Sequence, residues 1–316
     1  MQTTPDRQQT QQAAKDGLAP VARPDSSPAR SRRVDTGSEW FWPVVNLVGL
    51  VVVITVNVLA NVMEFNGLTT SEVVNHDPVY FQPAGWAFSI WSVIYVLLAV
   101  FVAYTFLSVG RENSRMRKIS PIFLVSNIAN ALWIVFWHWE QWDLTLATMA
   151  VLLVSLILLY YLLRRRRGIA TQPATIERLM VWTPFSVYLA WVSVATLSNV
   201  AVWSDRTGAD IWGMDGRWTA VIFLLGLVAA TALMALWLRD PTYAVVIIWA
   251  AAGITLEQWD RSKLVSIAAG LTVVLATALA VFGSLLAFEQ RQRGRVLPSA
   301  AAADDHHRRF WQRPRT

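Results

Sequence analysis

Aromatic rings and uncharged amides inside apolar segments are the side chains of this chain best suited to chemistry. The two richest segments read Gly-Trp-Ala-Phe-Ser-Ile-Trp from Gly85 to Trp91 and Trp-Val-Ser-Val-Ala-Thr-Leu-Ser-Asn from Trp191 to Asn199. Aromatic faces stack on flat apolar molecules and amides orient a polar edge, whereas proton transfer needs an acid or a base. Neither segment contains an acid or a base, so the pattern predicts a ligand pocket and no catalytic residue.

The candidate residues recur at helical spacing, which places each set on one face of a helix. Phe88, Trp91 and Tyr95 follow an i, i+3, i+7 pattern, and similar stripes run from Asn127 to Trp137 and from Tyr188 to Asn199. An unpaired amide is costly in hydrocarbon, so these stripes should face the interior of a helix bundle. The candidate ligand-binding residues are Trp86, Phe88, Trp91, Tyr95, Asn130, Trp133, Tyr188, Trp191 and Asn199.

The same residue types also occur as plain packing contacts in membrane proteins. Amides between helices contribute about 0.6 kcal/mol each, and Trp residues at the ends of spans commonly lie at the membrane interface. Trp91, Trp133 and Trp191 differ from such residues because each shares its stripe with polar neighbours. An apolar pocket with a few polar groups is the usual form of a small-molecule site.

The composition excludes several other functions. The 316 residues are 55% hydrophobic and only 15% charged, whereas about 25% charged residues are usual in soluble domains. The absence of Cys excludes disulfides, thiolate zinc sites and cysteine nucleophiles. No HExxH, Walker A or GxSxG motif occurs. We expect no metal site, no required cofactor, no enzymatic activity and no nucleic-acid partner.

Eight apolar stretches have about the 20 residues that a membrane helix needs. They cover residues 41–62, 84–108, 119–138, 143–163, 178–203, 217–238, 242–257 and 263–288, and the seventh is the shortest. Residues 1–39 are rich in Gln, Pro, Ser and Arg and predict a disordered tail, and residues 289–316 form a second, basic tail. The sequence therefore predicts an all-α, polytopic membrane helix bundle with about eight transmembrane helices.

The distribution of basic residues predicts the orientation of the bundle. With the N-terminus in the cytoplasm, 23 of the 27 Lys and Arg fall in the tails and the cytoplasmic loops, and the run Arg164 to Arg167 is the strongest marker. Cytoplasmic loops carry an excess of basic residues. We therefore expect both tails in the cytoplasm and a plasma-membrane location, which in a bacterium is the inner membrane.

These motifs resemble the tryptophan-rich sensory protein / translocator protein (TspO/MBR) family. Its second helix carries Pro-x-Gly-Trp-x-Phe-x-x-x-Trp-x-x-x-Tyr, and this chain has Pro83 to Phe88 followed by Trp91 and Tyr95, with one residue fewer between Phe88 and Trp91. The Asn-x-x-Trp motif of the third helix matches Asn130 and Trp133. The motif Trp-Val-Ser-x-Ala-Thr-x-x-Asn of the last family helix matches Trp191 to Asn199 residue for residue.

The resemblance implies a five-helix unit over residues 40–203. The three additional transmembrane helices over 204–288 depart from the family pattern, because its single-domain members lack them. The resemblance implies a pocket for a tetrapyrrole such as a porphyrin or a haem-like molecule, and in some members for sterols or related flat lipids. It also implies a sensory or ligand-transfer role and a tendency to form homodimers. The family's pocket is capped by the loop after its first helix. Here that loop, residues 63–83, has no Trp, so its ligand contacts are not carried over.

Two other functions remain open from the residues alone. A secondary carrier of a small lipophilic metabolite is suggested by the eight helices and by a short likeness between residues 86–91 and 183–188. A membrane enzyme would need an acid–base group, and His138, Glu140 and Asp143 cluster at one end of a span. A solvated loop between two spans is the simpler account of that cluster.

Overall fold

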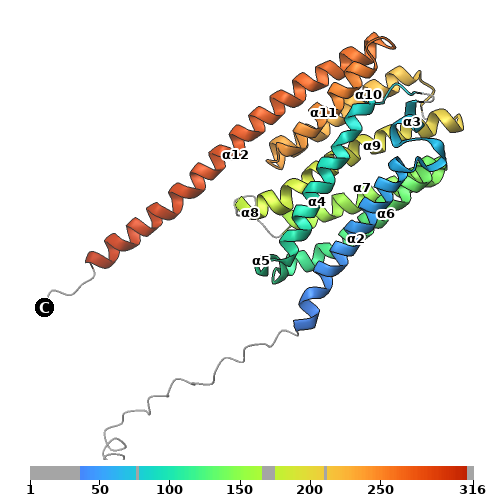
Figure 1. Ribbon diagram of the computed structural model, residues 1–316. Coiled ribbons are helices and arrows are strands. Elements are labelled where there is room, and N and C mark those ends of the chain that lie inside the picture. The colour runs from blue at the N-terminus through green and yellow to red at the C-terminus, as the bar shows by residue number, and fades with distance from the viewer. Residues whose placement is uncertain (1–35, 76–77, 166–174, 210–211, 312–316) are drawn as a thin grey trace, which may run out of the picture. The chain divides into compact units, whose positions relative to one another are not determined.

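Long apolar helices make up almost all of the described chain (Figure 1). The structure is a computed structural model that describes residues 36–75, 78–165, 175–209 and 212–311. No strand occurs within these ranges. The elements are α2 (Thr36–Val62), η1 (Phe65–Gly67), α3 (Thr70–Asn75), η2 (Gly85–Ser89), α4 (Ile90–Phe106), α5 (Ser108–Arg111), α6 (Ser114–His138), α7 (Trp142–Arg164), α8 (Thr175–Glu177), η3 (Arg178–Trp182), α9 (Thr183–Thr207), α10 (Gly216–Ala232), η4 (Leu233–Trp237), α11 (Thr242–Glu257) and α12 (Lys263–Trp311).

The polytopic helical membrane bundle predicted from the sequence is confirmed. Within the described ranges, seven helices are long and apolar enough to cross a membrane, and α11 is a shorter apolar helix of 16 residues. The eight predicted stretches coincide with these helices, and α11 is the stretch predicted to be shortest. The direction in which the bundle crosses the membrane stays a prediction, and nearly all of the predicted N-terminal tail lies outside the described residues.

Local signals at the helix ends agree with these bounds. The Asn113 side chain accepts a hydrogen bond from the backbone N–H of Arg115 at the start of α6 (2.9 Å). Asp215 caps α10 in the same way through the N–H of Arg217 (2.8 Å). Hydrogen bonds from the Arg217 side chain and backbone lower the pKa of Asp215 to about 2, so this cap stays charged at all ordinary pH values. Gly208 ends α9 in the left-handed conformation (φ 67°), which glycine adopts without strain.

The most buried helix is α9, which packs against α4, α7, α10 and α11. In the stretch Thr175–Thr207, which contains α9, 67% of the most apolar 18 residues are buried inside the protein, against 50% for α6, the next highest. A helix surrounded by neighbours is apolar on all sides, and the sequence around Trp191 has that character. Because α9 contacts helices on both sides of residue 203, it joins the first helices to the last three. The predicted division at residue 203 stays a prediction.

The last helix extends beyond the span predicted for it. The apolar part of α12, Lys263–Glu289, agrees with the span predicted over 263–288, and the helix continues to Trp311 through the segment predicted as a basic tail. Its membrane part packs against α10, η4 and α11. The approach to η4 is close, because a Cβ atom built on Gly283 would lie 2.8 Å from the Ala235 carbonyl oxygen and 3.1 Å from the Ala235 Cβ.

We predict that Gly283→Ala destabilises the protein by about 1–3 kcal/mol, because overpacking of a filled interface costs that much. The measurement is the thermal unfolding midpoint of the purified protein in detergent. Gly226→Ala in α10 is the matched control, since a Cβ there meets nothing within 4 Å. Equal midpoints for the two variants would contradict the close packing of α12 on η4.

Candidate ligand pocket

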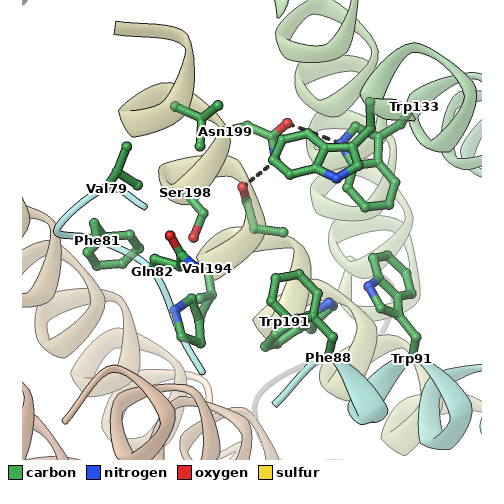
Figure 2. A pocket seen from close by; sticks show the side chains of 14 residues that line it. Val79, Phe81, Gln82, Phe88, Trp91, Trp133, Trp191, Val194, Ser198 and Asn199 are labelled. Atoms are coloured by element: carbon green, nitrogen blue, oxygen red, sulfur yellow. Dashed lines mark hydrogen bonds between the residues drawn. The ribbon is translucent and has the colours of Figure 1, made fainter. Parts of the chain in front are cut away.

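A cavity lies between α6, α9, the start of α4 and the chain segment before it (Figure 2). The atoms around it leave ≈ 430 Å³ unfilled, part of which is continuous with the outside. The lining residues are Val79, Phe81, Gln82, Pro83, Phe88, Trp91, Trp133, Trp137, Trp191, Val194, Ala195, Ser198, Asn199 and Val202.

Helical periodicity brings the α9 and α6 residues to the cavity. The lining residues of α9 begin at Trp191 and recur at intervals of three and one residues up to Val202, which is one helical face. Trp133 and Trp137 of α6 are four residues apart and also share a face. The two helices therefore present one aromatic and one mixed wall to the same space.

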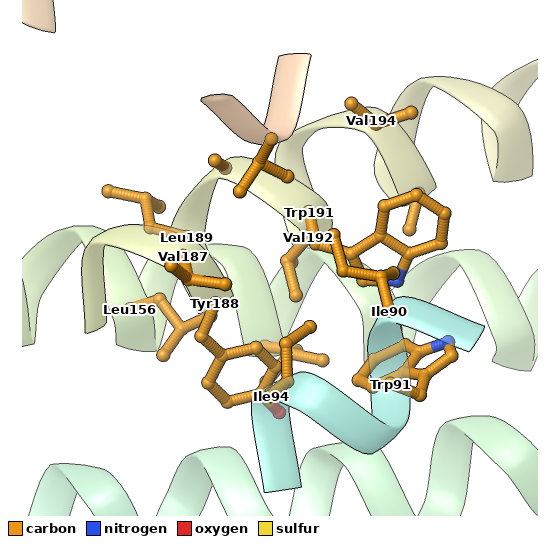
Figure 3. Close-up of a cluster of buried hydrophobic side chains, with 14 of the residues drawn as sticks. Ile90, Trp91, Ile94, Leu156, Val187, Tyr188, Leu189, Trp191, Val192 and Val194 are labelled. Atoms are coloured by element: carbon orange, nitrogen blue, oxygen red, sulfur yellow. The ribbon is translucent and has the colours of Figure 1, made fainter. Parts of the chain in front are cut away.

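Trp91 is the centre of the aromatic cluster beside the cavity. Its ring stacks on Trp133 with centroids 5.5 Å apart and on Tyr95 at 5.7 Å. It meets Trp191 edge to face at 6.3 Å and an interplanar angle of 88°. Figure 3 shows how Trp91 and its neighbours on α4 face Tyr188 and Trp191 of α9. Such aromatic pairs add about 0.5–1.5 kcal/mol each beyond the area they bury, so they hold the wall of the cavity rigid.

A buried hydrogen-bond network centred on Asn130 lies next to the aromatic cluster. The Asn130 side-chain oxygen accepts from Asn57 Nδ2 (3.0 Å) and from the Tyr95 hydroxyl (3.4 Å). Its amide nitrogen donates to the Tyr188 hydroxyl (2.8 Å). Asn130 thereby joins α2, α4, α6 and α9. The expectation that the amide stripes face the bundle interior is confirmed here, because Asn127, Asn130 and Asn199 are all buried.

Two polar atoms on the cavity lining have no partner among the described residues. These are the indole nitrogen of Trp191 and the hydroxyl oxygen of Ser198. By contrast, the indole nitrogen of Trp133 donates to the Asn199 side-chain oxygen (3.1 Å). The Trp191 side chain is only 1% exposed, and an unmade hydrogen bond of a buried donor costs about 1–3 kcal/mol. A molecule with a hydrogen-bond acceptor would relieve that cost by filling the cavity.

The structure brings most of the nine predicted residues together. Five of them line the cavity, namely Phe88, Trp91, Trp133, Trp191 and Asn199. Tyr95, Asn130 and Tyr188 lie directly behind that lining, in the network and the aromatic cluster. Their assignment as ligand-binding residues stays a prediction.

Trp86 is the predicted residue that lies apart from the cavity. Its side chain is 44% exposed, and its ring packs edge to face on Trp249 of α11 with centroids 4.7 Å apart. The segment from Gly85 to Ser89 is a 3₁₀ helix, so its side chains turn by about 120° per residue instead of 100°. Residues two apart lie on different sides of either kind of helix, so Trp86 and Phe88 have different surroundings.

Sequence reasoning missed four lining residues in the segment before α4. The cavity lining includes Val79, Phe81, Gln82 and Pro83. The sequence predicts no ligand contact for the loop over 63–83, because that loop has no Trp. The available signal was a short, mostly apolar run between Pro78 and Pro83. Trp137 also lines the cavity, and its place on the Asn127–Trp137 stripe was the signal for it.

The acidic and histidine residues at the end of α6 do not form a common site. His138 is buried, and its Nδ1 lies 2.8 Å from the Ile134 carbonyl oxygen. Asp143 accepts a hydrogen bond from the Trp203 indole (2.7 Å). No hydrogen bond or ion pair joins these two residues to Glu140 within the described ranges. The same ranges contain no group of His, Asp and Glu that could bind a metal ion.

Comparison with known families agrees with this arrangement of motifs and helices. The model of the family described as TSPO-like protein matches residues 43–282, which include every cavity-lining residue. The chain belongs to the TSPO-like protein family. The match continues past residue 203 through α10 and α11 and into α12, so these helices lie within the region that the family describes. No curated protein and no solved structure gives a significant match to this TSPO-like chain.

We predict that Asn130→Ala lowers the free energy of unfolding by about 1–3 kcal/mol, since it leaves buried polar partners unsatisfied. The measurement is the thermal unfolding midpoint in detergent. Thr277→Ala is the control, because the exposed Thr277 hydroxyl bonds only to a carbonyl of its own helix. A midpoint for Asn130→Ala as high as that of the control would show that the network does not stabilise the bundle.

Proposed function

We propose that this TSPO-like membrane protein binds a planar hydrophobic ligand in the cavity beside Trp91 and Trp191. The ligand class is a tetrapyrrole such as a porphyrin, or a sterol-like lipid. One observation carries the proposal: Trp191, whose buried indole N–H has no partner among the described residues, lines a cavity together with five other aromatic side chains. Flat apolar faces suit the rings, and one acceptor atom on the ligand suits the N–H.

The chemistry of the lining limits the ligand further. None of the 14 lining residues is charged. A carboxylate enclosed there would lose its hydration without gaining a cationic partner, which is strongly unfavourable. The part of the ligand inside the cavity is therefore neutral, and any carboxylate of a porphyrin stays outside it. The cavity is small, so only one edge of a larger flat molecule fits it without movement of its walls.

The proposed activity is binding that leads to sensing or transfer of the ligand, and not chemical conversion. The lining offers indole, amide, hydroxyl and apolar groups, none of which is an acid or base near neutral pH. The distribution of Lys and Arg supports a plasma-membrane protein with both termini in the cytoplasm. The proposed assembly is a homodimer, as the resemblance to the TspO/MBR family implies.

We predict saturable quenching of Trp fluorescence when the purified protein is titrated with a porphyrin. Trp191→Phe, which removes only the N–H and part of the ring, weakens the affinity about tenfold, because a lost hydrogen bond in a dry site costs about 1–2 kcal/mol. Trp237→Phe is the matched control, since Trp237 is 74% exposed and outside the lining. Affinity is read from the concentration at half-saturation, so the loss of one fluorophore does not affect it.

The uncharged lining predicts which porphyrin binds more tightly. The dimethyl ester of the porphyrin should bind at least as tightly as the free dicarboxylic acid, and neutral sterols should compete with both. A clear preference for the dicarboxylic acid would contradict the assignment of this cavity as the ligand-binding site. The same porphyrin affinity for Trp191→Phe and wild type would also contradict it.

Transfer and gradient-driven transport are separated by one vesicle experiment. Protein in donor vesicles loaded with the bound ligand should speed its exchange to acceptor vesicles without any ion gradient. Exchange that requires a gradient would instead favour a secondary carrier. Vesicles with the Trp191→Phe variant report whether the cavity mediates the exchange.

A further inference from the structure

One wall of the cavity is a stretch of chain without long helical structure, here called the covering segment (residues 78–87). It comprises an extended part and the first residues of η2. Val79, Phe81, Gln82 and Pro83 of this segment face the cavity (Figure 2). Backbone groups outside regular helices need hydrogen-bond partners from elsewhere when they are buried.

Helix α11 and the turn that follows it supply these partners. The backbone N–H of Ala84 donates to the Gly253 carbonyl oxygen (3.2 Å), and the Trp249 indole donates to the Ala87 carbonyl oxygen (3.0 Å). The Gln258 side-chain amide donates to the Val79 carbonyl oxygen (3.3 Å). These contacts join positions more than 160 residues apart in the sequence.

The close approach of α11 to the covering segment depends on a glycine. A Cβ atom on Gly253 would lie 3.0 Å from the Ala87 Cβ and 3.2 Å from the Pro83 Cβ. Both distances are shorter than comfortable contact, so a larger residue would push the segment away from the helix. Gly253 therefore allows the backbone hydrogen bond from Ala84 to form.

Two further contacts hold the same segment from outside the cavity. Arg261, in the turn after α11, donates from Nη2 to the Pro78 carbonyl oxygen (2.5 Å). The ring of Phe81 packs edge to face on Phe223 of α10 with centroids 5.4 Å apart. The segment thus lies between the cavity on one side and α10 and α11 on the other.

We propose that α11 is a clamp on the covering segment and that this clamp sets the rate at which a ligand enters and leaves the cavity. Trp249, Gly253 and Gln258 act as positioning residues, because they hold the segment and do not line the cavity. The statement about ligand exchange rests on the function proposed above, whereas the statement about the segment does not. It assigns a role to a helix that lies outside the predicted five-helix unit.

Hydrogen–deuterium exchange of the full-length protein in nanodiscs tests the clamp without any ligand. In Gln258→Met, which removes the donor at nearly constant volume, and in Trp249→Phe, amides of residues 79–87 should exchange about fivefold faster, the effect of losing one hydrogen bond of about 1 kcal/mol. Gly253→Ala should act in the same direction. Trp237→Phe and Gly226→Ala are the matched controls, because Trp237 is highly exposed and a Cβ on Gly226 meets nothing within 4 Å.

Two results of the hydrogen–deuterium exchange experiment would overturn the proposed clamp. The first is unchanged exchange of residues 79–87 in all three variants. The second is an equal acceleration in α6 and α9, which would mean that α11 supports the whole bundle instead of this segment.

The rate of porphyrin dissociation tests the second half of the proposal. Stopped-flow dilution of the porphyrin complex should give dissociation about fivefold faster in Gln258→Met and Trp249→Phe than in the two controls, in step with the amide exchange. Faster amide exchange with an unchanged dissociation rate would overturn control of ligand exchange by the clamp. If the wild type binds no porphyrin or sterol, the proposed function fails, and the amide exchange alone still decides whether α11 holds the segment.

Discussion

Hydrocarbon offers no partner to a polar group, and the arrangement of this bundle follows from that constraint. Asn130 satisfies it by bonding to side chains of three other helices, and Asn199 satisfies it by accepting from Trp133. These bonds fix the relative rotation of the helices, because each amide reaches its partners only from one face. The aromatic rings around Trp91 can then pack at defined angles, and the cavity forms where the rings do not fill the space. The Trp191 indole N–H is unpaired in the same interior, whereas the indole N–H of Trp133 is paired with Asn199.

The helices could be predicted almost completely from the sequence, because a bilayer imposes length and apolarity on each span separately. The eight predicted stretches needed no information about contacts, and even the short α11 was located. Site residues within regular α-helices were equally accessible, since Trp133, Trp191 and Asn199 follow from spacing alone. Trp86 lies apart from the cavity because it packs on Trp249 of α11, a contact that no local pattern in the sequence indicates, and its role in ligand binding stays a prediction.

The covering segment shows why the remaining part of the site could not be predicted. Residues 78–84 have neither helical nor strand periodicity, so no pattern tells which of their side chains face inward. Their positions are set by donors on α11, more than 160 residues away, and a contact of that kind leaves no local trace in the sequence. In the sequence, Gly253 is one of several small residues in an apolar helix. Only the structure shows that Ala87 and Pro83 pack directly against it.

Both walls of the cavity are therefore held by hydrogen bonds, but in different ways. On the α6 and α9 side, the bonds join side chains of regular helices within the bundle interior. The backbone groups there are already paired within their own helices. On the other side, the backbone of the covering segment itself depends on α11. Few hydrogen bonds must break to move that segment, whereas moving α9 would disrupt its packing with four other helices. Opening of the cavity is thus least costly on the side of the covering segment, and the free energy of that opening depends on α11 residues outside the cavity lining.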